Sequence, residues 1–355
     1  MRDDSSGIAP ILLGDRPVGP GKRCFVVAEA GVSHFGSMEK AFALVDAAVD
    51  AGCDAFKIQV FNTEALISRV AEEWRQRMRS KQLSHQDITS IRDYCRERSI
   101  LFFATGHDQV SVDFLHEMDI PFFKIGSGEV KNWPFMRYIG GLGRPVVLST
   151  GMYTLHDVEL AIESLKSGGC KEVVVLHCVT RYPATPDEIN LKAMDTLAES
   201  FQIPVGYSDH TEGFHICLAA VARGACLIEK HISLDFNVPN AQDWKVSLDP
   251  DGLKEMVRQI REIEDSLGDG TKEIRPRERE SISWARKSLV AVRDLEAGAV
   301  LTEELLIARR PGTGIAPSEL GLVVGLPLVQ PLSIDEPLTW SHLGKGEVRK
   351  EEKEP

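Results

Sequence analysis

The sequence has no paired cysteine motif, no long apolar run and no surplus of positive charge. Its 7 cysteines are scattered and form no CxxC pair, which argues against a disulfide framework or a zinc site of that kind. No stretch approaches the roughly 20 apolar residues that cross a bilayer, and the N-terminal MRDDSSG lacks the apolar core of a signal peptide. We therefore expect a soluble cytoplasmic protein with reduced thiols.

The charge balance is acidic, with 53 Asp and Glu against 41 Lys and Arg and a net charge of −12. Nucleic acids and anionic membrane surfaces both require clustered basic residues, so neither is an expected partner. If the substrate is anionic, the cations that bind it must be few, local and directed inward.

Short apolar runs alternate with longer segments of helical period over the first three quarters of the chain. The eight runs are Cys24–Gly31, Ala55–Phe61, Leu101–Gly106, Phe122–Gly128, Pro145–Gly151, Glu172–Val179, Pro204–Asp209 and Cys226–Ile232. Eight strand-then-helix units with strands buried on both faces predict a parallel (β/α)₈ TIM barrel. A doubly wound open sheet is the alternative, but no GxGxxG follows the first strand.

The pattern changes near Gly270, where a charged aperiodic segment precedes short strands broken by Gly and Pro. We predict an N-terminal extension at 1–20, the barrel at 21–272, a linker at 273–284, a small C-terminal β domain at 285–344 and a charged, disordered tail at 345–355.

Reactive residues of such barrels lie at the carboxyl ends of the strands and on the loops that follow. At these positions the sequence has Glu29, Lys57, Gln59, Thr105, His107, Lys124, Ser127, Glu129, Ser149, Thr150, His177, Tyr182, Ser208, Asp209, His210, Glu229, Lys230 and His231.

Two lysines within apolar strands are costly to bury without partners. Lys57 and Lys124 either pair with neighbouring carboxylates as structural groups or hold an anion at the mouth of the barrel. Ser127, Ser149 and Ser208, together with backbone N–H groups at the strand ends, could complete such an anion cradle.

His210 and His231 end adjacent predicted strands, so their imidazoles can approach one another. Near Glu29 and Asp209 they fit a divalent metal site with two nitrogen ligands and open positions for water or substrate oxygen. We expect Mn²⁺, with Mg²⁺ and Co²⁺ as alternatives. A single histidine at a strand end would more often be a structural hydrogen-bonding group.

These motifs resemble the sialic acid synthase family. VAEAGVSHFGS and FKIQVF are similar to its first two strand signatures, and FFKIGSGEVKNWP, VVLSTGM and LHCVTRYPATPDEINL to its fourth, fifth and sixth. VGYSDHTEG and IEKHISLD resemble the seventh and eighth, and ARRPGTGIAP resembles the family's C-terminal antifreeze-like domain.

The resemblance implies roles at matching positions. Metal ligation falls on His210 and His231, and catalytic roles fall on Glu29, Lys57 and Lys124. Phosphoenolpyruvate contacts fall on Lys57, Thr105, Lys124, Ser127, Ser149 and Ser208. Amino-sugar contacts fall on Gln59, Glu129, Tyr182, Asp243 and Arg310, and an aromatic residue of the same pocket on Trp284. Because the family's equivalent of Arg310 reaches the partner's barrel, the implied assembly is a domain-swapped homodimer.

The expected reaction is condensation of phosphoenolpyruvate with an N-acetylated hexosamine, giving a nine-carbon sialic-acid-type sugar and phosphate. A divalent-metal aldolase acting on a keto acid and a non-catalytic carbohydrate-binding or ice-binding protein are the alternatives. The hexosamine is left open between N-acetylmannosamine, its 6-phosphate and a diamino-dideoxy hexose. A 6-phosphate would need an extra cation, for which Arg181 is the candidate.

Overall fold

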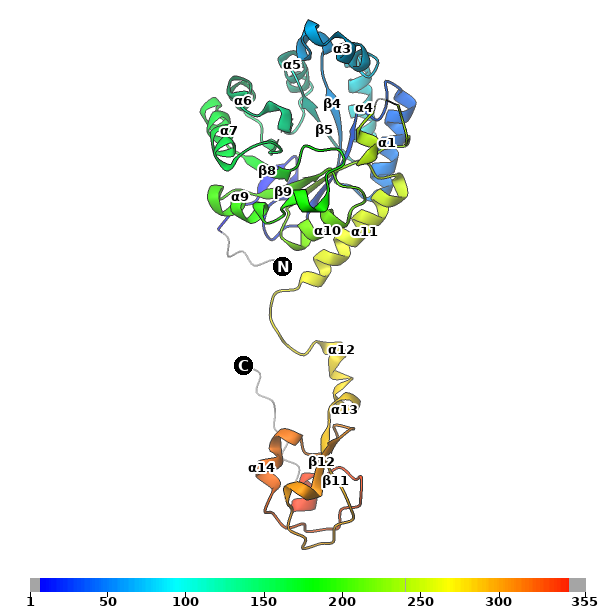
Figure 1. Ribbon diagram of the computed structural model, residues 1–355, viewed down its shortest axis with the longest axis vertical. Coiled ribbons are helices and arrows are strands. Elements are labelled where there is room, and N and C mark those ends of the chain that lie inside the picture. Colours follow the sequence, from blue (N-terminus) through cyan, green and yellow to red (C-terminus); the bar gives the residue numbers. More distant parts are fainter. Residues whose placement is uncertain (1–6, 240, 345–355) are drawn as a thin grey trace. The chain divides into compact units, whose positions relative to one another are not determined.

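The computed structural model in Figure 1 describes residues 7–239 and 241–344. The chain divides into two compact units, Met1–Gly270 and Thr271–Pro355. Within the described ranges, no helix has both the length and the apolar character needed to cross a membrane.

The first unit is a closed barrel of eight parallel strands, in the order β10-β3-β4-β5-β6-β7-β8-β9. The strands are β3 Phe25–Gly31, β4 Ala55–Val60, β5 Leu101–Gly106, β6 Phe123–Ile125, β7 Val146–Ser149, β8 Val173–Cys178, β9 Val205–Asp209 and β10 Leu227–His231. The predicted TIM barrel is therefore confirmed. The fourth strand is shorter than expected, because residues 127–129 form a 3-10 turn that lifts Ser127 out of the sheet.

Helices surround the barrel on its outer side (Figure 1). They are α1 Met38–Ala51, α4 His85–Glu97, α5 Gln109–Glu117, α6 Trp133–Gly140, α7 Leu155–Gly168, α9 Ala193–Phe201, α10 His215–Ala222 and α11 Pro250–Leu267. Their ends follow local rules: Ser37 caps α1 by accepting from Lys40 N, and Gly52 ends it at φ 78°.

Short elements lie in the loops after the strands. The long β4–α4 loop contains α2 Thr63–Leu66, η2 Arg69–Ala71 and α3 Glu72–Arg79. The others are η3 Ser127–Glu129, α8 Pro186–Ile189 and η4 Asp243–Lys245. These loops form the rim of the face where strand-end side chains gather.

The expected extension at 1–20 includes an antiparallel hairpin of β1 Ile11–Leu13 and β2 Arg16–Val18, which the sequence analysis did not predict. Leu13 and Val18 have no solvent exposure and join a buried cluster with strand residues such as Phe25 and Leu227. The hairpin therefore closes the amino-terminal end of the barrel with apolar side chains.

The second unit contains the small β domain. Its pair of antiparallel strands is β11 Ser288–Ala291 and β12 Leu306–Arg309. Short helices are α12 Pro276–Arg279, α13 Ile282–Ala285, η5 Glu303–Leu305, η6 Pro317–Glu319, α14 Leu320–Val323 and η7 Trp340–Leu343. Leucines such as Leu289, Leu332 and Leu338 form its separate core. The segment predicted as a linker contains α12 and most of α13, and the predicted tail lies outside the described residues.

Candidate active site

A polar cavity of about 130 Å³ lies at the carboxyl ends of the barrel strands. It is lined by Glu29, Lys57, Gln59, Thr105, His107, Lys124, Gly126, Ser127, Gly128, Ser149, Cys178, Thr180, Tyr182, Ser208, His210, Glu229 and His231. The structure thus brings together most of the residues selected from the sequence, because alternate side chains of each strand point to the barrel axis.

Lys57 sits at the floor of the cavity with 2% of its surface exposed. Its Nζ lies 2.8 Å from Glu29 Oε2 and 3.5 Å from Glu229 Oε1, and it donates to Thr105 Oγ1 at 3.1 Å. A buried ammonium is tolerated here because carboxylates and a hydroxyl replace its water.

Lys124 is the second buried cation and is 3% exposed. Its Nζ donates to Ser149 Oγ at 2.7 Å and to the Ile125 carbonyl at 3.3 Å, and lies 3.6 Å from Glu229 Oε1. Ser208 Oγ also donates to Glu229 Oε1, at 3.2 Å. Glu229 therefore links both lysines, while its Oε2 has no hydrogen-bond partner among the described residues.

The pKa values of the two carboxyls in this cluster are shifted in opposite directions. Burial raises the pKa of Glu29 to about 7, although Lys57 opposes the shift. Burial would also raise the pKa of Glu229, but Lys124 and Lys57 together hold it below its ordinary value. When Glu29 is protonated and Glu229 ionised, two lysines lie beside a single carboxylate, and the cluster then favours an incoming anion.

Serine 127 lies beside this cluster on the 3-10 turn. Gly151 N donates to Ser127 Oγ at 2.9 Å, which ties the β6 and β7 loops together. A Cβ on Gly151 would lie 2.1 Å from Thr180 Oγ1, so only glycine allows this approach. Because these two loops pack closely, the side chains of Ser127 and Thr180 both line the cavity wall.

His210 and His231 form the other side of the cavity, with ring centroids 5.5 Å apart. His210 Nδ1 lies 2.7 Å from the Val179 carbonyl, an interaction that orients the ring and leaves Nε2 free of that contact. His231 Nδ1 is buried without a hydrogen-bond partner among the described residues. Adjacent imidazoles with an unpartnered ring nitrogen fit a divalent cation.

Across residues 7–239 and 241–344, no three His, Cys, Asp or Glu side chains converge as a metal-binding group. The histidine pair would therefore supply two protein ligands, and water or substrate oxygen would complete the coordination.

Asp209 is not part of this site, contrary to the expectation that it lies beside the metal. Its Oδ2 accepts from Lys230 Nζ at 2.6 Å, with both side chains completely buried. His177 also faces away from the cavity, with Nε2 2.6 Å from the Ile189 carbonyl. Strand alternation explains both, because Ser208 and Cys178 occupy the inward positions next to them.

Several predicted sugar-contacting residues border the histidine side. Gln59 Nε2 donates to Glu29 Oε1 at 3.3 Å, and the Tyr182 ring lies 4.1 Å from that of His210. If Gly31 carried a Cβ, that atom would lie 3.1 Å from Asp243 Oδ2 and 3.4 Å from Glu29 Oε1. The two carboxyl groups therefore lie on the same side of Gly31. Burial raises the pKa of Asp243.

Glu129 lies at a neighbouring cavity of about 760 Å³ rather than in the strand-end cavity itself. Its lining includes Leu66, Pro134, Phe135 and Tyr138. His107 lines both cavities, so they adjoin at its imidazole. Burial and the charges of Lys57 and Lys124 lower the pKa of His107 to about 4, which keeps the ring neutral.

The two remaining predicted residues belong to the second unit. Trp284 is 60% exposed on α13. Arg310 is exposed after β12, and its Nε donates to the Ala285 carbonyl at 3.0 Å. Their predicted contact with sugar in a partner's barrel stays a prediction.

Glu229 was among the strand-end candidates but received no specific role from the sequence, and Cys178 and Thr180 were not candidates. The place of Glu229 in the cavity follows from its position two residues before His231, since residues i and i+2 share a face of a strand. Cys178 lies two residues beyond the inward Leu176, and its Sγ is 3.6 Å from His210 Nδ1.

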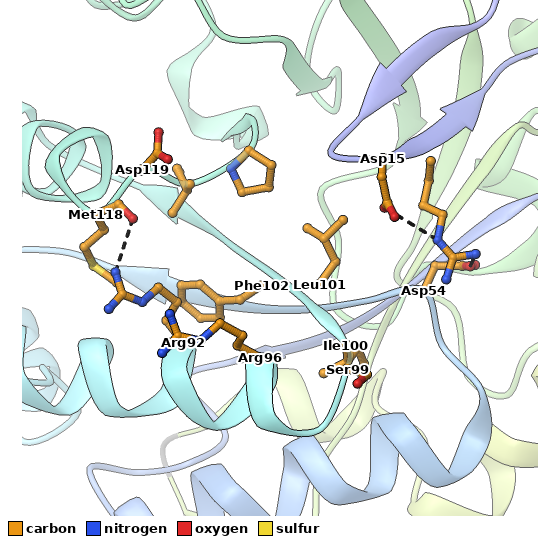
Figure 2. Close-up of a pocket in the computed structure, with 13 residues that line it drawn as sticks. Asp15, Asp54, Arg92, Arg96, Ser99, Ile100, Leu101, Phe102, Met118 and Asp119 are labelled. Carbon is orange, nitrogen blue, oxygen red and sulfur yellow. Dashed lines mark hydrogen bonds and ion pairs between the residues drawn. The ribbon is translucent and has the colours of Figure 1, made fainter.

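A cavity of about 580 Å³ lies at the opposite ends of the strands (Figure 2). Arg92 and Arg96 of α4 and Asp15 of the hairpin line it, but Arg92 donates to the Met118 carbonyl and to Asp93. Arg96 also lies 3.3 Å from Asp93. Among residues 7–239 and 241–344, no buried polar atom lacking a hydrogen bond belongs to its lining. The strand-end cavity differs, because its lining includes buried polar atoms without a hydrogen-bond partner among the described residues, Glu229 Oε2 and His231 Nδ1.

Known proteins are similar to this chain over most of its length. N,N'-diacetyllegionaminic acid synthase of Legionella pneumophila is 38% identical over 349 residues, which cover 94% of this chain and 98% of that protein. The N-acetylneuraminate-9-phosphate synthase of Homo sapiens is 34% identical, covering 88% of this chain and 91% of its own.

A solved structure of an N-acetylneuraminic acid synthetase from Leptospira borgpetersenii, in complex with citrate, is similar with a TM-score of 0.71 and 32% identity. The similarity covers 77% of this chain and 95% of that one. Residues 44–272 match the NeuB family, and residues 286–344 match the SAF domain. This chain therefore belongs to the NeuB family and is an enzyme of that synthase group, with a C-terminal SAF domain.

Proposed function

We propose that this enzyme condenses phosphoenolpyruvate with the open-chain aldehyde of an N-acylated hexosamine, releasing phosphate and a nine-carbon keto sugar acid. The observation that carries the proposal is the strand-end cavity, which places two buried lysines beside two adjacent histidines. One side suits a small polyanion, and the other suits a cation and a carbonyl oxygen. The names of the relatives agree with this class of product.

Phosphoenolpyruvate would bind at the lysine side. Lys57 and Lys124 are 2% and 3% exposed, so an anion there meets ammonium groups that water does not screen. Ser149, Ser208 and Thr105 already hydrogen-bond within this cluster and can turn their hydroxyls toward phosphate or carboxylate oxygens. Such charge-assisted hydrogen bonds orient a planar enol phosphate.

The sugar would bind at the histidine side. When bound by His210 and His231, a divalent cation such as Mn²⁺ supplies a Lewis acid for the aldehyde carbonyl. Gln59, Tyr182 and Asp243 border this region and can hold the sugar's hydroxyl and amide groups.

The reaction joins C3 of phosphoenolpyruvate to the aldehyde carbon, and the aldehyde oxygen takes a proton. Water adds at C2, the C2–O bond to phosphate breaks, and the product retains a C2 ketone. Glu29, with a pKa near 7, can deliver or accept a proton at neutral pH. Holding the two reactants in line provides most of the rate gain.

We propose that the hexosamine carries no phosphate. Within the described linings of the strand-end and neighbouring cavities, the lysines and arginines are Lys57 and Lys124, both in the anion cluster. Arg181, the candidate for a 6-phosphate, is exposed and forms an ion pair with Glu188. Glu129 and Asp108 line the neighbouring cavity and would repel a phosphate.

An acylamino substituent fits the neighbouring cavity better, since Phe135 and Tyr138 provide apolar surface beside Glu129 and Asn132. A diacetamido-dideoxy hexose is therefore the first candidate, and N-acetylmannosamine the second. The legionaminic acid synthases among the relatives, at 38% and 39% identity, support this order.

The complete site would form in a cytoplasmic domain-swapped homodimer, in which Arg310 and Trp284 of one chain complete the partner's barrel.

The test of the function is phosphate release from phosphoenolpyruvate by purified enzyme. We expect release only when both an N-acylated hexosamine and Mn²⁺ are present, with the diacetamido sugar giving the highest kcat/KM. Cleavage of a keto acid without phosphoenolpyruvate would instead identify a divalent-metal aldolase.

A further inference from the structure

An ion pair between Asp209 and Lys230 lies behind the histidine side of the cavity. Lys230 Nζ is 2.6 Å from Asp209 Oδ2, and both side chains have no solvent exposure. The two residues are direct register partners on β9 and β10. Neither lines the strand-end cavity, so the pair lies on the outer face of these strands.

Each member of the pair directly precedes one of the two histidines in sequence. Asp209 precedes His210, and Lys230 precedes His231. Because side chains alternate along a strand, an outward ion pair between neighbouring strands is followed by two inward imidazoles. The separation of the histidines therefore depends on how these two strand ends are held together.

The pair also fixes the residue on the other side of His210. Thr211 donates its N–H and its hydroxyl to Asp209 Oδ1, at 3.1 and 2.9 Å, and its carbonyl accepts from Lys230 Nζ at 2.7 Å. Tyr207 donates its hydroxyl to Asp209 Oδ1 at 2.8 Å. The backbone of His210 is thus held between two residues that both bind Lys230.

These contacts are more specific than packing requires. A buried ion pair is weak evidence for stability, because apolar residues of similar volume can pack as well. Short directional bonds, in contrast, hold each donor and acceptor within a narrow range of distances and angles. A metal ligand needs this precision, since partners that orient ligands affect affinity by roughly 10–100-fold.

We propose that Asp209 and Lys230 are positioning residues that set the geometry of His210 and His231 for a divalent cation. This inference rests on the metal site of the proposed function. It assigns no contact with metal or substrate to either residue.

The experiment measures Mn²⁺ binding to the metal-free, full-length protein, with free Mn²⁺ read by electron paramagnetic resonance. The double variant Asp209→Asn/Lys230→Met removes both charges without leaving one unpaired. We expect its Mn²⁺ affinity to fall by about 10–100-fold. Its affinity for phosphoenolpyruvate, measured by calorimetry in EDTA, should fall far less, because the ammonium groups of Lys57 and Lys124 come from β4 and β6 and only Ser208 and Glu229 lie next to the altered pair.

Arg261→Met is the matched control. Arg261 forms a largely buried ion pair with Asp54 at 3.0 Å, where Asp54 precedes β4 at the opposite end of the barrel. Its loss should lower the melting temperature while leaving Mn²⁺ affinity as in the unchanged protein. Thr211→Val is a milder second variant, which removes one hydroxyl from Asp209 and should weaken Mn²⁺ binding several-fold even if the double variant does not fold.

The positioning role is wrong if the folded double variant binds Mn²⁺ as tightly as the unchanged protein. If the double variant does not fold, the same result for Thr211→Val decides the question. In either case the proposed metal site stands. Parallel loss of Mn²⁺ and phosphoenolpyruvate binding would also overturn it, since that indicates general loosening of the barrel. If the unchanged protein binds no Mn²⁺, the metal site of the proposed function is itself wrong, and this inference fails with it.

Discussion

Lys57 Nζ and Glu29 Oε2 are 2.8 Å apart at the floor of the barrel cavity, where both side chains are almost completely shielded from water. In spite of this contact, burial keeps the pKa of Glu29 raised to about 7. The strand-end carboxyl is therefore close to half protonated at neutral pH, a property with a measurable effect on stability.

Glu29→Gln tests that titration. The folded protein binds the Glu29 proton more tightly than the unfolded chain, whose ordinary value is 4.5. The contribution of protonated Glu29 to the free energy of unfolding is therefore fully present below pH 4.5, and it is lost as pH rises through about 7. Relative to the variant, the free energy of unfolding should fall over this window by at most about 3 kcal/mol. Urea unfolding of both proteins in EDTA between pH 4.5 and 8 measures this change. A difference in unfolding free energy between them that does not vary with pH would contradict the raised pKa of Glu29.

Lys124→Met tests the anion cluster. The change keeps most of the side-chain volume and removes a buried charge-assisted hydrogen bond, which contributes about 1.5–3 kcal/mol. We expect kcat/KM for phosphoenolpyruvate to fall by roughly 10–100-fold. Lys171→Met, at an exposed position before β8, is the control. A rise in KM for the sugar alone would show that the division of the cavity is wrong.

His231→Ala tests the metal site. Turnover and Mn²⁺ binding should disappear together, because the variant loses one of two adjacent imidazoles. His156→Ala changes an exposed histidine on α7 and should alter neither. Full activity of His231→Ala with unchanged Mn²⁺ binding is the result that excludes the site.

Arg310→Ala tests the exchange of domains between chains. As an ordinary exposed arginine it would change stability by within about 0.5 kcal/mol and leave activity intact. If it completes the partner's site, the variant loses sugar binding but keeps Mn²⁺ and phosphoenolpyruvate binding. Mixing it with His231→Ala should then restore up to about one quarter of full activity, since half the dimers are mixed and each has one complete site. No recovery after verified subunit exchange would mean that Arg310 does not act across the interface.

Leu13→Ala tests the hairpin that closes the barrel. Leu13 is completely buried, so its truncation leaves a cavity that should cost about 2–5 kcal/mol of unfolding free energy. The kcat/KM of the remaining folded enzyme should not change, because the hairpin lies at the end opposite the active site. Chemical denaturation together with steady-state kinetics measures both quantities.

The fold was predictable because each barrel strand is a short, almost entirely apolar run, as in Phe25–Gly31. The hairpin was not, since its strands have three residues each and one contains Pro17. Its stability comes from burial against the barrel rather than from a local pattern. The shortened β6 was missed for a similar reason, because residues 127–129 form a 3-10 turn at the end of an apolar run.

Site residues were predictable where their position at a strand end was enough to tell that the side chain points into the barrel. Lys57, Lys124, His210 and His231 all reach the cavity. Asp209 was placed wrongly because closeness in sequence to His210 was taken as closeness in space, whereas the intervening alternation turns it toward Lys230. The pKa values of Glu29 and Glu229 depend on partners from different strands, which spacing within one segment does not reveal.

The hairpin at the amino-terminal end of the barrel also packs against a segment that is synthesised much later. Leu13 and Val18 share their buried cluster with Cys226 and Leu227, near the start of the last barrel strand. At about 5–20 residues per second, roughly 10–40 s of synthesis separate the two segments. The hairpin precedes all eight barrel strands, so its packing cannot be complete until the last of them has been made, and until then part of its apolar surface is available to chaperones.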